Sequence, residues 1–279
     1  MEKRILKGQL TAFVKHLEGE ERSEATRKKY LRDVMKFYER VKTNDLSKEK
    51  IVAYKADLLN EYAVSSCNSM IAALNAFLRF CGFGNLCVKQ FKVQRQAYCS
   101  EEKELTKAEY LRLVQTAKRK GNERLELILQ TICACGIRVS ELPYITVEAV
   151  KRGEANVNCK GKNRRIFLVK DLRKKLLNYI TKQKIKTGSV FVTRSGKPMS
   201  RHNIWREMKS LCEQANVAPS KVFPHNLRHL FARIFYGIEK DVVKLADILG
   251  HSNINTTRIY IVSTGIEHRR KLENMRLIV

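Results

Sequence analysis

The first 85 residues contain none of the chain's four prolines, and their apolar residues recur at the spacing of a helical face. Within Leu10–Leu17 these residues fall at i, i+3, i+4 and i+7, on one side of a helix. Similar stretches follow Ser23, Ser47 and Ser66, each suited to be an N-cap. The inward-facing residues are Leu10, Phe13, Val14, Leu17, Tyr30, Val34, Phe37, Ile51, Tyr54, Leu58, Tyr62, Met70, Leu74, Phe77 and Leu78. We therefore expect a small bundle of four helices that ends at Gly82.

Beyond residue 87 the pattern changes. Residues 88–103 show no periodicity and are predicted to be a linker with a basic first part. Two short β-like runs, Ala155–Asn158 and Arg165–Val169, flank a basic turn at Lys160–Asn163. Helices are expected at Thr106–Lys118, Asn122–Cys135, Leu172–Lys184, His202–Gln214, His225–Tyr236, Val242–Leu249 and Asn255–Ile261. The predicted fold is mainly α with a small β-sheet: a helical domain at 1–87 and an α+β domain at 104–279.

The net charge indicates the class of partner. With 55 Lys+Arg against 28 Asp+Glu, the 279-residue chain carries +27, and its 44% hydrophobic content argues against a disordered polycation. So many like charges repel one another unless a polyanion relieves them, and nucleic acid is the commonest such partner. No apolar run approaches the roughly 18 residues of a membrane span, and no secretory signal is visible. We expect a cytoplasmic protein that binds nucleic acid and has no membrane partner.

The eight cysteines favour a reducing compartment rather than a metal site. None forms a CxxC pair, and no histidine pair stands at zinc-finger spacing. Cys133 and Cys135 flank Ala134 within an apolar stretch, where packing in the core is the expected role. We expect no bound metal and no cofactor.

The segment PHNLRH at 224–229 is the densest group of positively chargeable side chains. On a helix His225 and Arg228 are i, i+3 neighbours, so both can face one anion. A zinc-protease interpretation would use His225 and His229, but Asn226 stands where the catalytic glutamate is needed. An anion-binding site is the better interpretation.

Three further segments could contribute to such a site. In CGIRVSEL the apolar helix is interrupted at Gly136, and Arg138 comes just after it. The chain is then expected to continue as a helix to Glu141. CKGKNRR places Lys160 at the tip of the predicted hairpin, and LGHSNINTTRIY contains His251 and Tyr260. Together the segments supply fixed positive charge for a pentacoordinate phosphorus and a tyrosine that could attack it.

These four segments, in this order, resemble the tyrosine recombinase (phage integrase) family, and most of all its Xer-like and mobile-element integrases. The intervals are close to those of the family: 22 residues from Arg138 to Lys160, 26 from His225 to His251 and nine from His251 to Tyr260. The first 87 residues resemble the family's SAM-like core-binding domain by architecture. The resemblance implies a site-specific recombinase that cleaves and rejoins DNA.

The resemblance also implies a role for each matching residue at the phosphate. Arg138 and Arg228 would hold the non-bridging oxygens of the scissile phosphate, and His251 would form a hydrogen bond to it. Tyr260 would attack phosphorus, which leaves a 3′-phosphotyrosyl link and a free 5′-hydroxyl.

Proton transfer and orientation are assigned in the same way. His225 would manage the proton of the nucleophile, and Lys160 would protonate the leaving 5′-oxygen. Lys162 is a second candidate for this acid, because the turn contains both lysines. Glu141 matches the family's acidic position and would orient its neighbours.

The biological role is less closely determined than the chemistry. The residues VFP before His225 and KLADI before LGH depart from common family patterns. These departures favour integration and excision of a mobile element, with Xer-like resolution of chromosome or plasmid dimers as the alternative. A type IB topoisomerase-like enzyme and a non-catalytic sequence-specific DNA-binding protein are rival interpretations.

The resemblance further implies partners. Family members assemble as tetramers on two double-stranded DNA sites, and the amphipathic tail at 265–279 is expected to dock into a neighbouring copy or to pack back on its own chain. An accessory DNA-bending or directionality factor is a possible further partner, and a bacterial, nucleoid-associated location follows.

Overall fold

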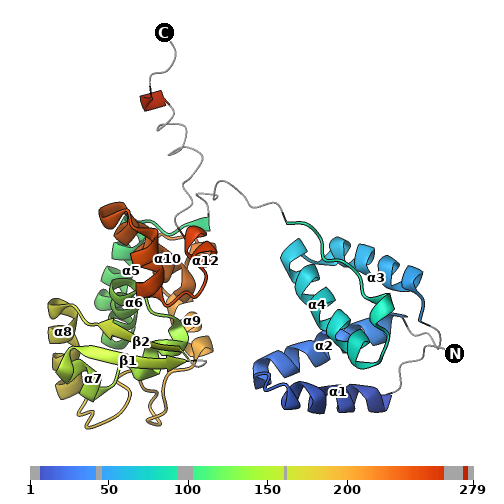
Figure 1. The fold of residues 1–279 in the computed structure, drawn as a ribbon. Helices are drawn as coiled ribbons and strands as arrows, with labels where there is room; N and C mark the ends of the chain where they lie inside the picture. The colour runs from blue at the N-terminus through green and yellow to red at the C-terminus, as the bar shows by residue number, and fades with distance from the viewer. Residues whose placement is uncertain (1–6, 42–45, 94–102, 160–161, 261–272, 276–279) are drawn as a thin grey trace. The chain divides into compact units, whose positions relative to one another are not determined.

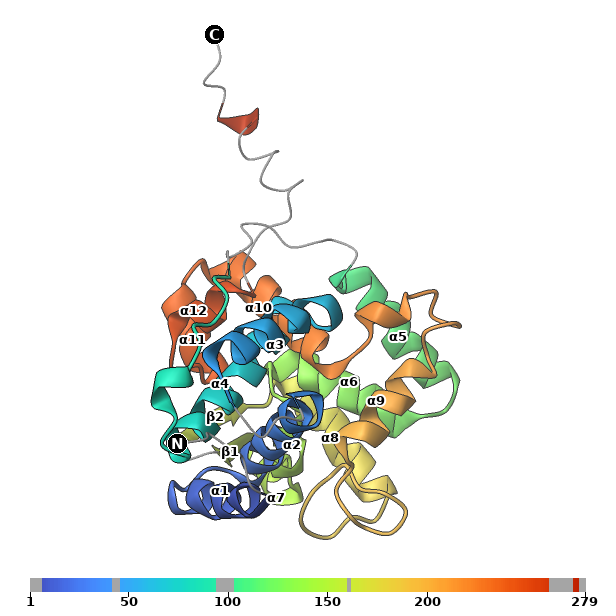
Figure 2. The same ribbon diagram turned by 90° about the vertical axis from the view of Figure 1, so that its right-hand side faces the viewer.

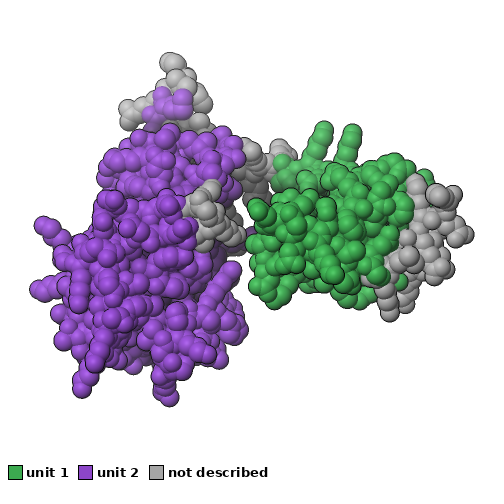
Figure 3. Space-filling model, turned by 60° about the horizontal axis from the view of Figure 1, so that its bottom comes forward, with its two compact units in different colours: residues 1–95 green, residues 96–279 purple. Residues whose placement is uncertain are grey.

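A computed structural model describes residues 7–41, 46–93, 103–159, 162–260 and 273–275 of the chain (Figure 1). The chain divides into two compact units, residues 1–95 and 96–279, which Figure 3 distinguishes by colour. Both units are mostly helical and unit 2 adds a two-stranded sheet, so the expected fold class is confirmed. Among the described residues, no helix combines the length and apolar character needed to cross a bilayer.

The described part of unit 1 contains α1 (Lys7–Gly19), α2 (Glu24–Val41), α3 (Lys48–Glu61), α4 (Val64–Phe80) and the 3-10 turn η1 (Gly84–Leu86). α4 packs against α2 and α3, and α1 packs against α2 (Figure 2). Phe13, Phe37 and Phe77 are each 0% exposed in the core, which confirms the inward positions expected for them. The rings of Phe13 and Phe77 meet edge to face, with centroids 5.2 Å apart.

The start of α3 is as expected, whereas the start of α4 is not. The hydroxyl of Ser47 accepts a hydrogen bond from the N–H group of Lys50, as an N-cap should. α4 begins at Val64 instead of after Ser66, with Ala63 in the extended N-cap position and no side-chain cap. The N–H group of Ser66 already donates to the Ala63 carbonyl at 2.8 Å, so Ser66 lies within the first turn.

After η1 the chain runs along α4, where two asparagines hold its backbone. Asn75 donates to the carbonyl of Val88 at 2.8 Å and accepts from its N–H group at 3.0 Å. Asn68 does the same for Phe91, at 2.9 and 2.7 Å. The residues just after position 87 therefore pack on unit 1, and the domain boundaries 1–87, 88–103 and 104–279 stay a prediction.

The described part of unit 2 contains α5 (Lys107–Arg119), α6 (Glu123–Cys135), η3 (Val139–Tyr144), α7 (Val147–Arg152), β1 (Glu154–Cys159), β2 (Lys162–Phe167), α8 (Lys170–Lys182), α9 (Arg201–Lys209), η4 (Pro219–Lys221), α10 (Pro224–Glu239), α11 (Val242–Leu249) and α12 (Ile254–Arg258). The central helix α6 packs against α5, α8 and α10. Its residues Ile128, Leu129 and Ile132 are 0% exposed, and Cys133 and Cys135 are buried beside them, as predicted.

The hairpin of unit 2 differs from the expectation. The second strand begins at Lys162 rather than at Arg165, and Cys159 pairs directly with Lys162. The basic composition of this stretch predicted a turn, but strand pairing uses backbone groups, which charged side chains do not block. Asn163 and Arg164 therefore belong to β2, and Arg164 lies opposite Val157 in the register.

Candidate active site

The end of α6 places Arg138 at the site. Gly136 adopts φ +60°, a left-handed conformation that glycine takes without strain. A Cβ atom at this position would lie 2.4 Å from the ring of Phe231, so the close approach also requires glycine. The expected continuation as a helix through Arg138 is therefore wrong: the chain turns, and η3, which contains Glu141, begins after Arg138 as a 3-10 helix.

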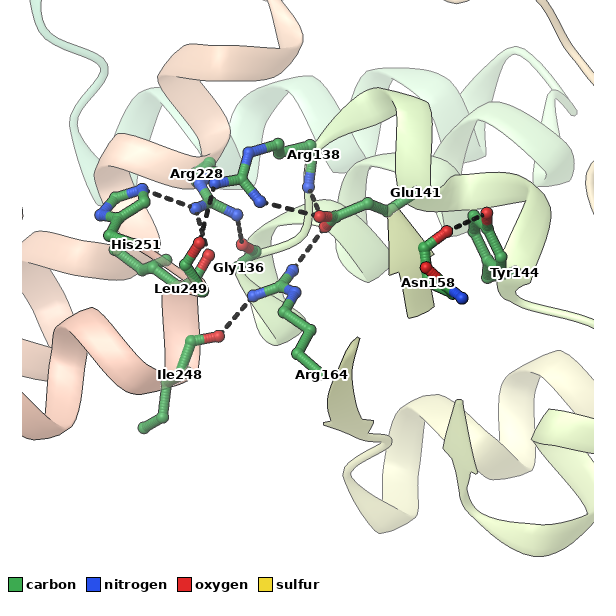
Figure 4. A network of polar contacts seen from close by, with 11 residues as sticks. Gly136, Arg138, Glu141, Tyr144, Asn158, Arg164, Arg228, Ile248, Leu249 and His251 are labelled. Atoms are coloured by element: carbon green, nitrogen blue, oxygen red, sulfur yellow. Dashed lines mark hydrogen bonds and ion pairs between the residues drawn. The ribbon is translucent and has the colours of Figure 1, made fainter. Parts of the chain in front are cut away.

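The C-terminal end of α11 gathers three arginines that are distant in sequence (Figure 4). Carbonyl groups at a helix end have no partner within the helix, and the helix dipole makes this end negative. Three consecutive carbonyls each accept from one guanidinium group: Ile248 from Arg164, Leu249 from Arg228 at 2.6 Å and Gly250 from Arg138 at 3.4 Å. One helix end thus positions all three cations.

Arg228 is fully buried, at 0% exposure. Besides Leu249 its guanidinium donates to the carbonyl of Gly136 at 2.7 Å and faces Nε2 of His251 at 2.9 Å. Burial, with the positive charge of Arg138, lowers the pKa of Arg228 to about 10. Arg228 therefore remains a cation at neutral pH even though it is removed from solvent.

The carboxylate of Glu141 lies between two of these arginines, and its side chain is 1% exposed. Its Oε1 accepts from the guanidinium of Arg138 at 2.8 Å, and its Oε2 accepts from the Arg138 N–H group at 2.8 Å and from Arg164. Burial acts to raise the pKa of Glu141, but these hydrogen bonds and positive charges lower it overall. Glu141 therefore stays ionised and fixes the direction of Arg138.

The contacts of His251 define its tautomer. An arginine can only donate, so Nε2 of His251 accepts from Arg228, and the ring proton lies on Nδ1, 2.9 Å from Oγ1 of Thr257. Burial and the charges of Arg228 and Arg138 lower the pKa of His251 to about 4. Both observations give a neutral ring at neutral pH.

Tyr260 follows α12 and lies against three imidazole rings, at 5% exposure. Its hydroxyl is 3.2 Å from Nε2 of His225, and its ring stacks on His229 with centroids 4.1 Å apart. Burial and the charge of Arg228 lower the pKa of His225, which keeps this ring neutral and able to accept the tyrosine proton. The arrangement pairs a nucleophile with a base.

A cleft of about 670 Å³ runs beside this cluster. Arg138, Arg164 and His251 line it together with Asn163 of the hairpin. Asp247 is an acidic group on the same wall. An anion that enters the cleft would meet the guanidinium groups of Arg138 and Arg164 and the side-chain amide of Asn163.

The structure brings six of the predicted site residues together: Arg138, Glu141, His225, Arg228, His251 and Tyr260. Lys160 lies outside the described residues, and Lys162 begins β2, where only its backbone is described. Within the described ranges, no group of three His, Cys, Asp or Glu residues could hold a metal ion.

Sequence reasoning missed three residues of the cluster. Arg164 precedes buried Ile166 by two positions, and this alternation could have placed it on the inner face of β2. His229 lies one turn after His225, and Thr257 lies three residues before Tyr260. Both were within the segments already singled out, but their partners depend on the fold.

Comparison with known families agrees with this geometry. The profile of the Phage integrase family matches residues 103–265, and that of the Phage integrase N-terminal SAM-like domain matches residues 10–81. The chain belongs to the phage integrase family. It is a tyrosine recombinase, an enzyme of site-specific DNA cleavage and rejoining.

Individual members of the phage integrase family cover different shares of the chain. Tyrosine recombinase XerA of Pyrococcus horikoshii is 28% identical over 279 residues, which span 96% of this chain and 94% of that protein. Tyrosine recombinase XerH of Campylobacter jejuni is 32% identical over 162 residues, which span 54% of this chain and 45% of that protein.

Solved structures of two integrases share the fold. A lambda integrase dimer bound to a COC′ core site has a TM-score of 0.74 at 17% identity, with 93% of this chain and 96% of that chain covered. The Tn1549 transposon integrase in complex with transposon right end DNA has a TM-score of 0.69 at 14% identity, with 97% and 99% covered.

Proposed function

We propose that the cluster binds the scissile phosphate of a DNA recombination site, with Arg138 and Arg228 at its non-bridging oxygens. The observation that carries the proposal is the hydroxyl of Tyr260, 3.2 Å from Nε2 of His225, while the ring of Tyr260 lies 5.3 Å from that of His251, which contacts Arg228. Fixed guanidinium groups stabilise the negative charge that builds up on a pentacoordinate phosphorus. The nucleophile, its base and the charge stabilisers thus come from one unit of one chain.

The reaction exchanges one phosphodiester bond for another. The oxygen of Tyr260 forms a bond to phosphorus while the bond from phosphorus to the 5′-oxygen breaks, which leaves a 3′-phosphotyrosyl link and a 5′-hydroxyl. His225 takes the tyrosine proton, and Lys160, with Lys162 as the second candidate, gives a proton to the leaving oxygen. The energy of the bond is retained, so rejoining requires no nucleotide.

His251 changes its hydrogen bonding when DNA binds. Without DNA its Nε2 accepts from Arg228 at 2.9 Å, so it has no proton to offer a phosphate. A phosphate anion opposes the effect of Arg228 and Arg138 and raises the pKa of this ring. Protonated at Nε2, His251 then donates to the phosphate while Nδ1 keeps its bond to Thr257.

Integration and excision of a mobile element is the proposed biological role, and Xer-like dimer resolution is the alternative. The unusual residues before His225 and before LGH support the first. The protein would act in the bacterial cytoplasm on the nucleoid, as a tetramer on two DNA sites. The tail at 265–279, of which the structure describes 273–275, would dock between copies, and an accessory factor would set the direction.

The first experiment recovers DNA that is covalently attached to the protein. Tagged wild type and Tyr260→Phe are expressed in a host that carries the native locus, denatured in SDS and purified, and the attached DNA is sequenced. Attachment at one or two discrete loci, in wild type only, is the expected result. Attachment scattered over the genome would favour a topoisomerase-like enzyme, and none from either protein would favour a non-catalytic DNA-binding protein.

A chemically modified substrate separates the two lysines. A phosphorothioate in which sulfur replaces the bridging 5′-oxygen needs no protonation of its leaving group. We expect it to restore cleavage by Lys160→Ala, measured as covalent complex. Restoration of Lys162→Ala alone would transfer the role to Lys162.

A further inference from the structure

Arg164 of β2 connects three separate parts of the site, as Figure 4 shows. Its guanidinium donates to Oε2 of Glu141 in η3 and to the carbonyl of Ile248 at the end of α11. Its aliphatic part packs on Gly250, where an added Cβ would lie 2.8 Å from Cδ of Arg164. The Arg164 side chain is only 10% exposed, so it is packed within the protein and largely shielded from solvent.

The position of Arg164 determines how Arg138 meets Glu141. Arginine and carboxylate favour a paired contact with two parallel hydrogen bonds. Here the guanidinium of Arg138 reaches only Oε1, because Arg164 and the Arg138 N–H group occupy Oε2. Arg138 therefore keeps part of its guanidinium free of the carboxylate, and its side chain is 39% exposed where that of Arg164 is 10%.

We propose that Arg164 is a positioning residue for DNA cleavage, which occupies Oε2 of Glu141 so that Arg138 presents its remaining N–H groups to the phosphate. Arg164 acts through Glu141 and need not touch the reacting atoms. This inference rests on the proposed role of Arg138. Without Arg164, the carboxylate draws Arg138 toward a two-point contact and away from the phosphate.

Arg165, the next residue of β2, provides a matched control. It lies on the opposite face of the strand, its side chain is 60% exposed and its nearest carboxylate partner is Glu154 at 3.6 Å. Arg164→Ala and Arg165→Ala remove the same charge from adjacent positions, but only the first leaves Glu141 without its second arginine.

The inference also predicts a change in pH dependence. Glu141 faces Arg138 just before η3, Arg164 in β2 and Arg228 in α10, and Asp247 of α11 lines the same cleft. Removal of Arg164 takes away one positive charge that lowers the pKa of the buried carboxyl, so this pKa rises. Cleavage by Arg164→Ala should then decline at a higher pH than cleavage by wild type as the solution is acidified.

The test measures single-turnover formation of covalent complex by the full chain. The substrate is a nicked duplex that carries the site recovered from the attached DNA. We expect Arg164→Ala to slow cleavage about tenfold or more at saturating protein, with less than a threefold change in DNA dissociation constant, because roughly 1 Å of misplacement can cost about 100-fold. Arg164→Lys, which keeps a charge beside Glu141, should recover part of the rate and the wild-type pH profile.

Arg165→Ala should cleave at nearly the wild-type rate. Equal losses for Arg164→Ala and Arg165→Ala, or a wild-type rate and pH profile for Arg164→Ala, would overturn the inference. If Arg164→Ala does not fold, Arg164→Gln and Arg164→Lys decide it by the same two readouts. Cleavage that survives Arg138→Ala would contradict the proposed site itself, whereas loss in Arg138→Ala with none in Arg164→Ala contradicts only the positioning role.

Discussion

The two units of this recombinase bury polar groups in different ways. Unit 1 buries Asp33 at 4% exposure, and Lys29 and Arg32 donate to its carboxylate at 2.6 and 3.1 Å. Unit 2 buries Arg228 at 0% exposure, and the nearby Arg138 carries a charge of the same sign. The Nε atom of Arg228 is buried and has no hydrogen-bond partner among the described residues. In the first arrangement opposite charges compensate the buried group, whereas in the second the buried group is a cation that lies near another cation.

This difference separates a buried charge that has its partners within the fold from one that is suited to bind a ligand. A buried cation costs free energy unless opposite charge or hydrogen bonds compensate it, and carbonyl groups compensate only in part. In the proposed function an entering phosphate would complete the compensation at Arg228, whereas Asp33 already has its partners within unit 1. Stability should therefore depend most on apolar packing in unit 1, and activity most on charge in unit 2.

The largest expected effect on stability is in unit 1. Phe37 is 0% exposed and packs against Tyr54 with ring centroids 4.9 Å apart. Phe37→Ala should lower the free energy of unfolding of this unit by about 3–5 kcal/mol, because it removes buried apolar area and leaves a cavity. Denaturant unfolding followed by circular dichroism measures it. A loss below that of the surface variant Met35→Ala would contradict the apolar role.

The second prediction concerns unit 2, where removal of a buried charge should affect activity more than stability. Arg228→Met should slow covalent complex formation by about 100- to 1,000-fold, because it removes one fixed donor to the phosphate. Its cost in stability should be smaller than that of Phe37→Ala, since loss of the cation also removes repulsion with Arg138. Single-turnover cleavage and denaturant unfolding of the same preparation test both parts. If Arg228→Met cleaves at the wild-type rate, or loses as much stability as Phe37→Ala, the proposed difference between the two units is contradicted.

The third prediction concerns pH. Burial lowers the pKa of His229 from 6.5 to about 4, so between these values the unfolded chain binds the proton more tightly than the folded one. Stability of unit 2 should therefore fall as the pH drops from 6.5 to 4. His229→Phe keeps a ring against Tyr260 but cannot titrate, so its melting temperature should fall less steeply over this range. His202→Phe is the control. If the melting temperature of His229→Phe falls with pH as steeply as that of wild type, His229 does not contribute to the pH dependence of stability.

The smallest expected effect concerns the start of α4, which the sequence predicted after Ser66 and the structure places at Val64. Ser47→Ala should cost about 1 kcal/mol, because it removes the side-chain acceptor for the N–H group of Lys50. Ser66→Ala should cost less or stabilise, because Ser66 lies inside α4 and alanine favours helices. Thermal unfolding of the two variants compares them directly. If Ser66→Ala loses more stability than Ser47→Ala, Ser66 acts as an N-cap after all.

Local features of the sequence predicted much of both units. Apolar spacing gave the helices of unit 1, since residues such as Phe13 and Phe77 need only one face of a helix to reach the core. Gly136 was recognised as a helix end, and the helix expected at Val242–Leu249 stops just before Gly250; both glycines have positive φ. The start of β2 was misjudged because the basic composition of 160–163 predicted a turn, whereas a strand is set by backbone pairing with β1.

The contacts inside the site could not be predicted in this way. Arg164 reaches the carbonyl of Ile248, 84 positions away, and Arg138 reaches that of Gly250, 112 positions away. A backbone carbonyl carries no residue identity, so no pattern in the sequence marks it as an acceptor. The resemblance placed the arginines near one phosphate, but only the fold shows what holds them before DNA arrives.

The end of α11 gives the site a particular tolerance to mutation. Because the acceptors are carbonyl oxygens of Ile248 and Leu249, substitution of either side chain by another apolar residue leaves every acceptor in place. Insertion or deletion of a single residue within α11 would instead rotate these carbonyls by about 100° relative to the helix start and misdirect all three arginines at once. Homologues are therefore expected to exchange one apolar residue for another at these two positions and to keep the length of the helix.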